Sequence, residues 1–256
     1  MVDFSRISHC ALSFNGTNLD KKLKNYMTVN VEGRQLFAPN LNTVSVPGRD
    51  GDIVIDKTYP ARDIKVYFLM YAENNEEWLK QIKELTNSLQ SKGDIWFSFA
   101  DEEGERHGQL SHFEDPPYDS NIGIGSFTLH CQDPFLYSDI KISSGDMPDL
   151  KYSYYNVKIE SLAAKISSSC KKVKISNDTK GLHIILNGGF YAGDNLVLYE
   201  DSIVRGNTNI VKYIDYLNSD YHNFKIYAKD RISVRVYSGS SVEYAPVYFR
   251  YRERIL

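Results

Sequence analysis

Histidines and carboxylates are the side chains of this sequence that could carry out catalysis or hold a metal ion. His107 and His112 lie five residues apart in a loop-like stretch, which supplies two imidazole ligands without a clear third. Asp194, Glu200 and Asp201 are the nearest approach to the carboxylate pair of a glycosidase. In a chain of short strands such carboxylates are far more often turn and edge residues, so neither group predicts an active site.

The cysteines and the short catalytic and nucleotide-binding motifs likewise predict no active site. Cys10, Cys131 and Cys170 are odd in number, far apart and without CxxC spacing, which argues against both a disulfide framework and a zinc site. The pattern favours free, buried thiols in a protein made in a reducing cytoplasm. The sequence has no GxSxG, Walker, HExxH or GxGxxG motif. We therefore predict that the protein is not an enzyme and uses no cofactor or metal.

Composition indicates a globular protein that does not insert into membranes. The 256 residues are 42% hydrophobic and 25% charged, both typical of folded domains. Apolar runs stay well below the roughly 18 residues that a membrane span needs, and the first residues do not form a signal peptide. The formal net charge of −3 is a poor basis for holding nucleic acid through its phosphates.

Charge and tyrosine content divide the chain into two parts. Residues 1–135 hold 13 Lys+Arg and 20 Asp+Glu, a balance of −7, whereas residues 136–256 hold 17 and 13, a balance of +4. Five tyrosines lie in the first part and 14 in the second. We expect a first domain over residues 1–138, a linker over 139–150 and a second domain over 151–256.

The first part predicts short strands around one helix. Asn15-Gly16 is the residue pair that most favours a two-residue β-hairpin turn. A helix is expected over residues 75–91, because its apolar residues recur on one face; they are Trp78, Ile82, Leu85 and Leu89. Strands are expected over residues 9–14, 26–31, 41–46, 52–55, 64–70, 95–99 and 125–131. The breaker-rich stretch 46–51 predicts a loop between two of them.

The second part predicts short strands at spacings of about ten residues, a pattern typical of a β-sandwich or jelly roll. They are expected over residues 173–176, 182–186, 196–199, 224–228, 232–237 and 247–251. Turns are expected at residues 187–189 and 192–194, and a short helix near 211–217.

Several segments, in order along the chain, carry a resemblance to a known family. They are Phe14-Asn15-Gly16, residues 46–51, residues 59–62, the helix at 75–91, residues 127–135, Ala192-Gly193-Asp194 and residues 248–252. Together the sequence resembles the distal tail proteins of siphophages that infect Gram-positive bacteria. The resemblance spans nearly the whole chain and rests on the order and spacing of these segments.

The resemblance implies both a fold and a role. The fold is mainly β, with an N-terminal β-sandwich carrying one α-helix, similar to tail-tube proteins, and a C-terminal galectin-like β-sandwich. The role is that of a structural virion protein at the tail tip, where six copies form a ring. That ring docks under the tail-tube protein and carries tail-associated, fibre or baseplate proteins. DNA passes through it only as cargo.

Candidate interaction residues follow from exposure and charge. They are Arg49, Asp50, Asp101, Glu102, Glu103, Tyr154, Tyr155 and Tyr216. The acidic run at 101–105 is most simply a solvated hairpin tip. The −7 balance of the first part suits a bore that repels DNA, although the same charge could lie on the outer surface. The alternative function is carbohydrate binding, because exposed tyrosines on a sandwich can stack on sugars; the candidates are Tyr152, Tyr154, Tyr155, Tyr213, Tyr216 and Tyr221. Tyrosines are equally enriched at protein interfaces, and strand tyrosines also simply fill sandwich cores, which is the leading interpretation.

Overall fold

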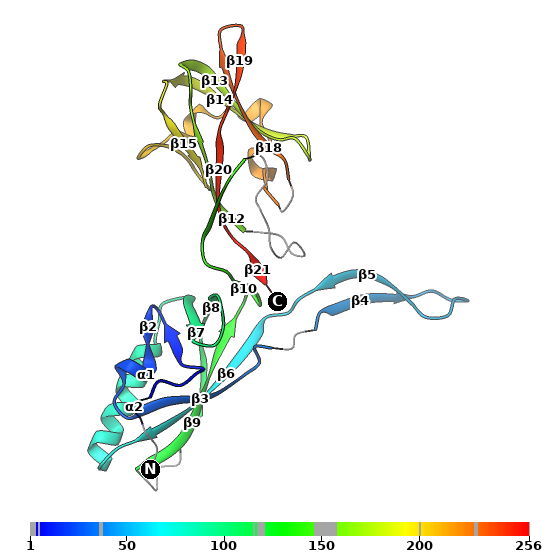
Figure 1. The fold of residues 1–256 in the computed structure, drawn as a ribbon. Coiled ribbons are helices and arrows are strands. Elements are labelled where there is room, and N and C mark those ends of the chain that lie inside the picture. The colour runs from blue at the N-terminus through cyan, green and yellow to red at the C-terminus, as the bar shows by residue number, and fades with distance from the viewer. Residues whose placement is uncertain are drawn as a thin grey trace. The chain divides into compact units, whose positions relative to one another are not determined.

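The computed structural model describes residues 4, 6–35, 38–114, 116, 121–145, 158–199, 201–227 and 230–255. The chain forms two compact units, residues 1–136 and residues 137–255 (Figure 1). Strands dominate both units, and the longest helix of the described residues, α2 (Asn75–Leu89), belongs to the first. The chain is therefore mainly β, as the sequence predicts.

The first unit is built on a seven-stranded sheet of order β2-β1-β7-β8-β9-β6-β3, with the hairpin β4–β5 beside it. Its elements are β1 (Leu12–Phe14), β2 (Thr17–Asn18), α1 (Leu19–Lys22), β3 (Tyr26–Glu32), β4 (Asn40–Ser45), β5 (Asp52–Thr58), β6 (Arg62–Tyr71), α2, β7 (Ile95–Phe99), β8 (Arg106–Glu114) and β9 (Ile122–Cys131). Each strand predicted for this part is present, with bounds that differ by a few residues.

Strand β8 joins the two halves of this sheet. Its residues 106–108 pair with β7, and its residues 109–114 pair with β9 across a register shift. Side chains from both halves then share one core with α2, among them Phe14 and Phe97 on one side and Val66 and Phe127 on the other. The N-terminal sandwich is thus a single sheet folded over a common core.

The β1–β2 turn confirms the hairpin predicted from Asn15-Gly16. Ser13 pairs with Asn18 and Phe14 with Thr17, which leaves these two residues as the loop. Asn15 has φ 51° and Gly16 has φ 71°. Two consecutive positive φ angles are the signature of a type I′ turn, whose twist matches that of the strands it joins.

Helix α2 buries the stripe predicted for it. The Asn74 side chain accepts a hydrogen bond from the Glu77 amide at 2.9 Å and so caps the first turn. Trp78, Leu85 and Leu89 are buried in the first core. The helix ends at Leu89, two residues before the predicted end, because Gln90 adopts an extended conformation (ψ 135°).

We expect Leu85→Asp to unfold the first unit. Leu85 is 1% exposed, and burial of a leucine contributes about 1.5–3 kcal/mol, which an unpaired buried carboxylate would reverse. Leu79→Asp is the matched control, because Leu79 on the same helix is 51% exposed. Thermal unfolding followed by circular dichroism checks the pair. A soluble Leu85→Asp protein that melts like Leu79→Asp would contradict the packing of α2.

The second unit is a two-layer β-sandwich. Its sheets have the orders β11-β20-β12-β15-β16-β17 and β14-β13-β18-β19, and a short ladder joins β10 to β21. Its elements are β10 (Leu136–Tyr137), β11 (Lys141–Ser144), β12 (Lys158–Lys165), β13 (Cys170–Asn177), β14 (Leu182–Phe190), β15 (Asn195–Leu198), β16 (Ile203–Arg205), β17 (Thr208–Asn209), η1 (Val211–Tyr213), η2 (Tyr216–Asn218), η3 (Tyr221–Asn223), β18 (Ile232–Ser238), β19 (Ser241–Ala245), β20 (Val247–Arg252) and β21 (Arg254–Ile255).

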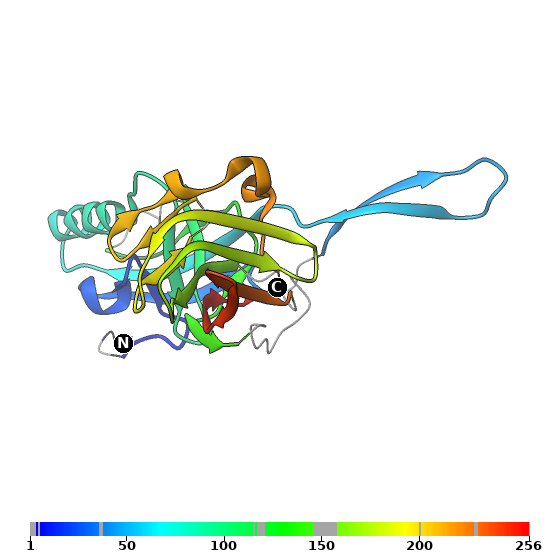
Figure 2. The same cartoon turned by 90° about the horizontal axis from the view of Figure 1, so that it is seen from above.

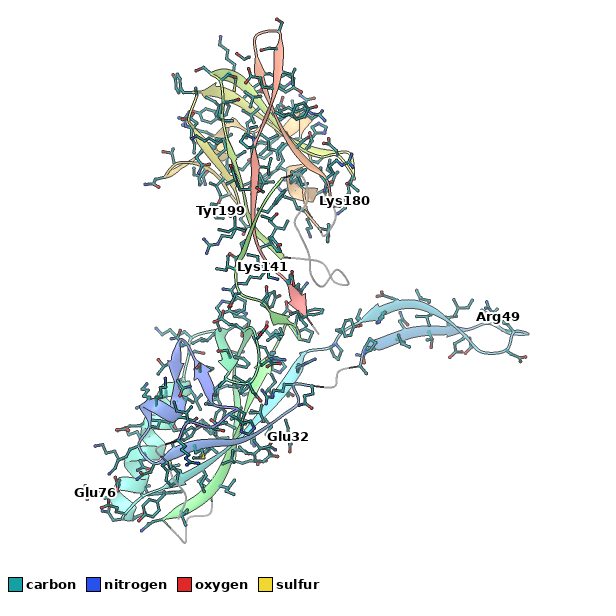
Figure 3. The ribbon with its side chains drawn as sticks, in the orientation of Figure 1. Glu32, Arg49, Glu76, Lys141, Lys180 and Tyr199 are labelled. Atoms are coloured by element: carbon teal, nitrogen blue, oxygen red, sulfur yellow. The ribbon has the colours of Figure 1, made fainter. Side chains whose placement is uncertain are left out.

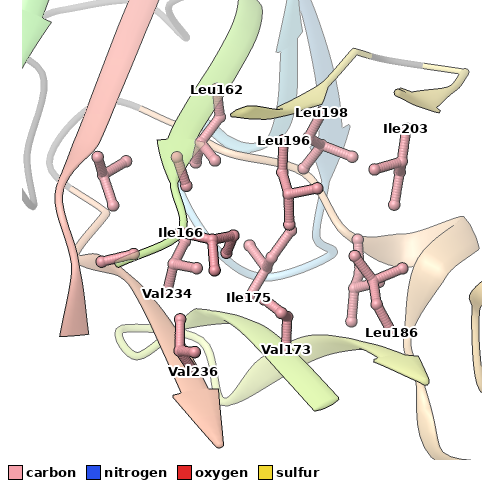
Figure 4. Close-up of a cluster of buried hydrophobic side chains, with 14 of the residues drawn as sticks. Leu162, Ile166, Val173, Ile175, Leu186, Leu196, Leu198, Ile203, Val234 and Val236 are labelled. Atoms are coloured by element: carbon pink, nitrogen blue, oxygen red, sulfur yellow. The ribbon is translucent and has the colours of Figure 1, made fainter. Parts of the chain in front are cut away.

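The core of the sandwich lies between its two sheets (Figure 4). Leu162 and Leu196 come from the six-stranded sheet, and Val173 and Val234 come from the four-stranded sheet. This arrangement confirms the sandwich that strand spacing predicts. Its specific likeness to galectins stays a prediction.

Four segments of the second unit differ from the sequence analysis. The strand expected over residues 224–228 is absent from the described part of that stretch, residues 224–227. Strand β11 lies inside the stretch expected to be a linker and pairs with β20; residues 146–150 of that stretch lie outside the described residues. The turn expected at 187–189 is part of β14. The Tyr213 ring packs against Gly188 in this strand. A Cβ added at Gly188 would lie 3.1 Å from the ring, so glycine leaves room for it. The expected helix near 211–217 is two separate 3₁₀ turns, η1 and η2.

The cysteines are free and buried, as their spacing predicts. Burial raises the pKa of the Cys131 thiol to about 12, so this side chain is a thiol rather than a reactive thiolate at neutral pH. Among the described residues, helices long and apolar enough to span a bilayer are absent.

A candidate assembly surface: the β4–β5 arm and its root

The hairpin of β4 and β5, residues 40–58, is called the arm. It extends away from the seven-stranded sheet (Figures 1 and 2), and among the described residues its strands pair only with each other. Every residue of the arm is exposed. An isolated two-stranded hairpin is marginally stable in water, so the arm is suited to being held against another surface.

Both faces of the arm carry exposed apolar side chains. Val44 pairs with Ile53, and the next pair along, Thr43 with Val54, points to the opposite face because strand side chains alternate. The large apolar side chains exposed on the arm are Leu41, Val44, Val46, Ile53, Val54 and Ile55. A strand with one solvated face would carry them on one side only, so the arm has the composition of a hairpin covered on both faces.

The tip of the arm is a structured turn. The Arg49 amide donates to the Val46 carbonyl at 3.1 Å, and the Ser45 hydroxyl donates to Asp52 at 2.6 Å across the end of the ladder. Arg49 lies at this tip (Figure 3), and Arg49 and Asp50 are both exposed. The stretch predicted as a loop is thus a charged tip presented far from the first core.

The root of the arm is fixed by a set of charged side chains, Arg34, Arg62, Asp101, Glu102 and Arg106, called the root cluster. Arg34 follows β3 and donates to both carboxylate oxygens of Asp101 at 2.6 Å. Its carbonyl accepts from Arg62 at 2.8 Å and from Arg106 at 3.3 Å. Since Arg62 begins β6 shortly after the arm, one carbonyl group links the chain segment that precedes the arm to the one that follows it.

Burial makes the root cluster depend on its ion pairs. Arg62 and Arg106 are each 2% exposed, and Arg106 binds Glu102 through two nitrogens. Burial lowers the pKa of Arg62, and the neighbouring Arg106 lowers it further. The hydrogen bonds from Arg34 hold the pKa of Asp101 below its ordinary value. The buried Arg106 therefore depends on Glu102 being ionised.

A close backbone contact completes the root. Gly33 has φ +85°, and an added Cβ would lie 2.2 Å from the Asp63 carbonyl oxygen. Only glycine fits this left-handed conformation at such a short approach. The chain therefore leaves β3 toward the arm along a path that backbone contact and ion pairs both define.

The acidic run at 101–105 is not simply a solvated hairpin tip. It does connect β7 to β8, but Asp101 and Glu102 are bound to Arg34 and Arg106 of the root cluster. Glu103 is exposed and has no ion-pair partner within the described parts of the chain. Arg34 lies 67 residues from Asp101 in the sequence, so no local pattern indicates the pairing.

The other candidate residues are not brought together. Tyr216 is 49% exposed, with its ring edge-on to Tyr221 at 6.0 Å. Tyr154 and Tyr155 lie outside the described residues, as does Glu200. Asp194 accepts from the Tyr191 amide at 2.9 Å as a turn residue. Across the described ranges, groups of three or more His, Cys, Asp or Glu side chains that could hold a metal are absent.

Comparison with known proteins defines the class of the first unit. Residues 17–131 match the family described as the phage tail protein RIFT-related domain. The match contains the arm, the root cluster and α2, so these features belong to a phage tail domain.

Longer matches extend the likeness to most of the chain. The distal tail protein of Bacillus phage SPP1 is 22% identical over 210 residues, which cover 78% of this chain and 82% of that protein. The crystal structure of SPP1 Dit aligns with a TM-score of 0.74 at 15% identity, covering 96% of this chain and 99% of that one. A chain of the phage p2 baseplate, in its activated conformation with strontium, aligns with a TM-score of 0.50 at 11% identity over 90% of this chain and 91% of that one. Over most of its length the chain is thus similar to a distal tail protein of a siphophage, which confirms the resemblance.

Proposed function

We propose that six copies of this chain close into a ring that forms the hub of the phage tail tip. The chain is a structural protein of the tail tip and not an enzyme, in keeping with its relatives. The arm is the observation that carries the ring. It presents two apolar faces that its own unit leaves uncovered, so we assign it to an adjacent copy.

In the proposed ring the arm makes a head-to-tail contact rather than a reciprocal two-fold one. The arm of one copy is donated and a different surface of the next copy receives it, which is a head-to-tail contact. Such contacts close into rings when the rotation between copies permits. The SPP1 relative is described as a paradigm of the hub of the adsorption apparatus in phages infecting Gram-positive bacteria, which supports the same role here.

The two units divide the contacts of the hub in this proposal. Residues 1–138 make the ring and meet the tail-tube protein, and residues 151–256 carry tail-associated, fibre or baseplate proteins outward. DNA passes through the bore as cargo. The root cluster limits which residues could make the bore negative, because Asp101 and Glu102 are neutralised by arginines. An acidic bore would depend on unpaired carboxylates such as Glu103 instead.

Native mass spectrometry and negative-stain electron microscopy test the ring. The full chain is measured alone and mixed with the tail-tube protein of the same phage, which supplies a docking surface if the isolated chain is monomeric. We expect a particle of six copies with a central hole, at least in the mixed sample. Only monomers or two-fold dimers in both samples would refute the ring.

Carbohydrate binding stays the alternative prediction. Tyr213 and Tyr221, from the same segment as Tyr216, pack partly buried against the second core, which leaves Tyr216 as the exposed candidate of the three. A glycan array and binding to isolated host cell walls separate the alternatives. Specific binding that Tyr216→Ala removes would support host recognition, and a clean negative would leave the assembly role.

A further inference from the structure

The two edges of the four-stranded sheet are treated differently. Residues 211–223 form hydrogen bonds with the backbone groups of β14 that point away from β13. The Asp215 amide donates to the Ile185 carbonyl at 2.9 Å, and the Asp220 amide donates to the His183 carbonyl at 2.8 Å. The Ile185 amide donates to the Ser219 hydroxyl at 2.9 Å. This edge is closed by the chain itself.

Strand β19 at the opposite edge is open (Figure 1). Residues 241–244 are exposed, and in the described parts of the chain the outer side of β19 meets no backbone partner. Ser238 pairs with Ser241 across a two-residue turn in which Gly239 has φ +60°. Counting from this turn, Val242 and Tyr244 fall at the positions whose N–H and C=O groups point away from β18.

The outer face beside this edge is cationic and aromatic. The register places Tyr244 beside Arg235 and Lys174, and Val242 beside Tyr237 and Lys172. The Lys172 ammonium lies 5.3 Å from the Tyr237 ring centroid, and the Arg235 guanidinium lies 5.7 Å from that of Tyr244. Each cation thus covers a ring on the next strand toward the open edge.

These cations are incompletely neutralised. Arg235 pairs with Asp178 at 3.1 Å. Within the described ranges, Lys172 and Lys174 meet no carboxylate at ion-pair distance. Tyr244 is 67% exposed and Val242 is 49% exposed. An exposed edge strand that carries large apolar side chains is one that proteins normally blunt or cover.

We propose that β19 receives an extended segment of a second protein as a fifth strand, with acidic side chains on the face shared with Lys172, Lys174 and Arg235. Main-chain bonds to Val242 and Tyr244 would supply the affinity, and carboxylates at every second position would supply the specificity. The identification of the second protein as a tail-associated protein rests on the proposed function. The strand addition itself involves only the second unit and needs no ring.

The test uses the full chain and a yeast-displayed library of random twelve-residue peptides. The expected outcome is enrichment of sequences with Asp or Glu at alternate positions between β-branched residues. The most enriched sequence is then synthesised with a fluorophore, and its dissociation constant is measured by anisotropy. A library without enrichment, or enrichment without acidic alternation, would overturn the proposal.

Two sets of variants separate main-chain from charge recognition. Val242→Pro removes an outward N–H while sparing the bonds to β18, and we expect about tenfold weaker binding, equal to about 1.4 kcal/mol. Val242→Thr keeps the N–H and should bind within about twofold of the parent. Lys172→Glu with Lys174→Glu should weaken binding by at least about tenfold. If Val242→Pro does not fold, Tyr244→Pro repeats the test at the second outward amide.

The remaining outcomes point to other occupants and overturn the proposal. Unchanged binding by both proline variants, with loss in the double lysine variant, would indicate a surface for anionic polymers, and heparin would then bind parent and proline variants alike. A doubled mass that Val242→Pro abolishes, without peptide binding, would indicate pairing between two copies. Failure of the ring leaves these results unaffected, because the peptide is measured on any oligomeric form.

Discussion

Replacement of residues 40–58 by a short Gly–Ser linker is expected to abolish the ring and leave both units folded. All residues of the arm are exposed, so its removal takes nothing from either core. Burial of each large apolar side chain in a neighbouring copy would contribute about 1.5–3 kcal/mol, and six of them lie on the arm. We therefore expect the ring population to fall by more than about a hundredfold. Native mass spectrometry measures the loss, and thermal unfolding verifies the fold.

Single substitutions make this test finer. Val44→Asp and Val54→Asp place a charge on opposite faces of the arm, and each should weaken the ring if both faces are covered. Asn42→Asp adds the same charge at a position that is already polar and is the matched control. A chain without the arm that still forms six-copy rings would assign the contact to another surface.

The second large effect is expected from Arg106→Met, which should destabilise the first unit by about 3 kcal/mol. Arg106 is 2% exposed and holds both Glu102 and the Arg34 carbonyl. Removal of one member of a buried ion pair typically costs about 3–5 kcal/mol, and partial exposure of Glu102 places this case at the lower end. Urea denaturation measures the change. Arg49→Met at the exposed tip of the arm is the control, and equal midpoints for the two variants would rule out a structural root cluster.

The root cluster should also give the first unit an acid dependence. Arg34 holds the pKa of Asp101 below its ordinary value, so the folded chain binds the proton of this carboxyl less tightly than the unfolded chain does. The resulting stability is present above the unfolded carboxyl pKa of about 4 and is lost as the pH falls through the lower, folded value. Asp101→Asn should therefore lower stability at pH 7 and reduce the further loss on acidification.

Local patterns were sufficient to predict the elements but not the root cluster. The stripe through Trp78 and Leu85 predicts α2 because a helix has a fixed period, and Asn15-Gly16 predicts its turn because few other pairs adopt two positive φ angles. Arg34 and Asp101, by contrast, meet across 67 residues. Their pairing depends on how β3, β7 and β8 are arranged in the sheet, which no short-range pattern encodes.

The arm shows a second limit of sequence patterns. Residues 41–46 and 64–70 both predict strands, yet β6 is an interior strand of the sheet, between β9 and β3, whereas β4 is exposed throughout. Alternation of apolar and polar residues indicates that a segment is a strand, but it does not indicate which other element covers that strand. The useful signal is the presence of apolar residues on both faces of β4 and β5, beside the charged, glycine-containing tip at 46–51, because that combination suits a hairpin buried only after assembly.

Gly33, which directly follows β3, has a consequence for how many copies the proposed ring contains. Contact of Gly33 with the Asp63 carbonyl and the bonds around the Arg34 carbonyl set the direction in which the hairpin leaves its own unit. In a head-to-tail assembly that direction fixes the turn from each subunit to the next, about 60° for closure at six. In the proposed ring, the number of copies would then depend on a backbone contact within a single subunit. A substitution at Gly33 would leave the side chains of the arm unaltered, and in the proposed ring we expect it to give a different closure number or an open spiral.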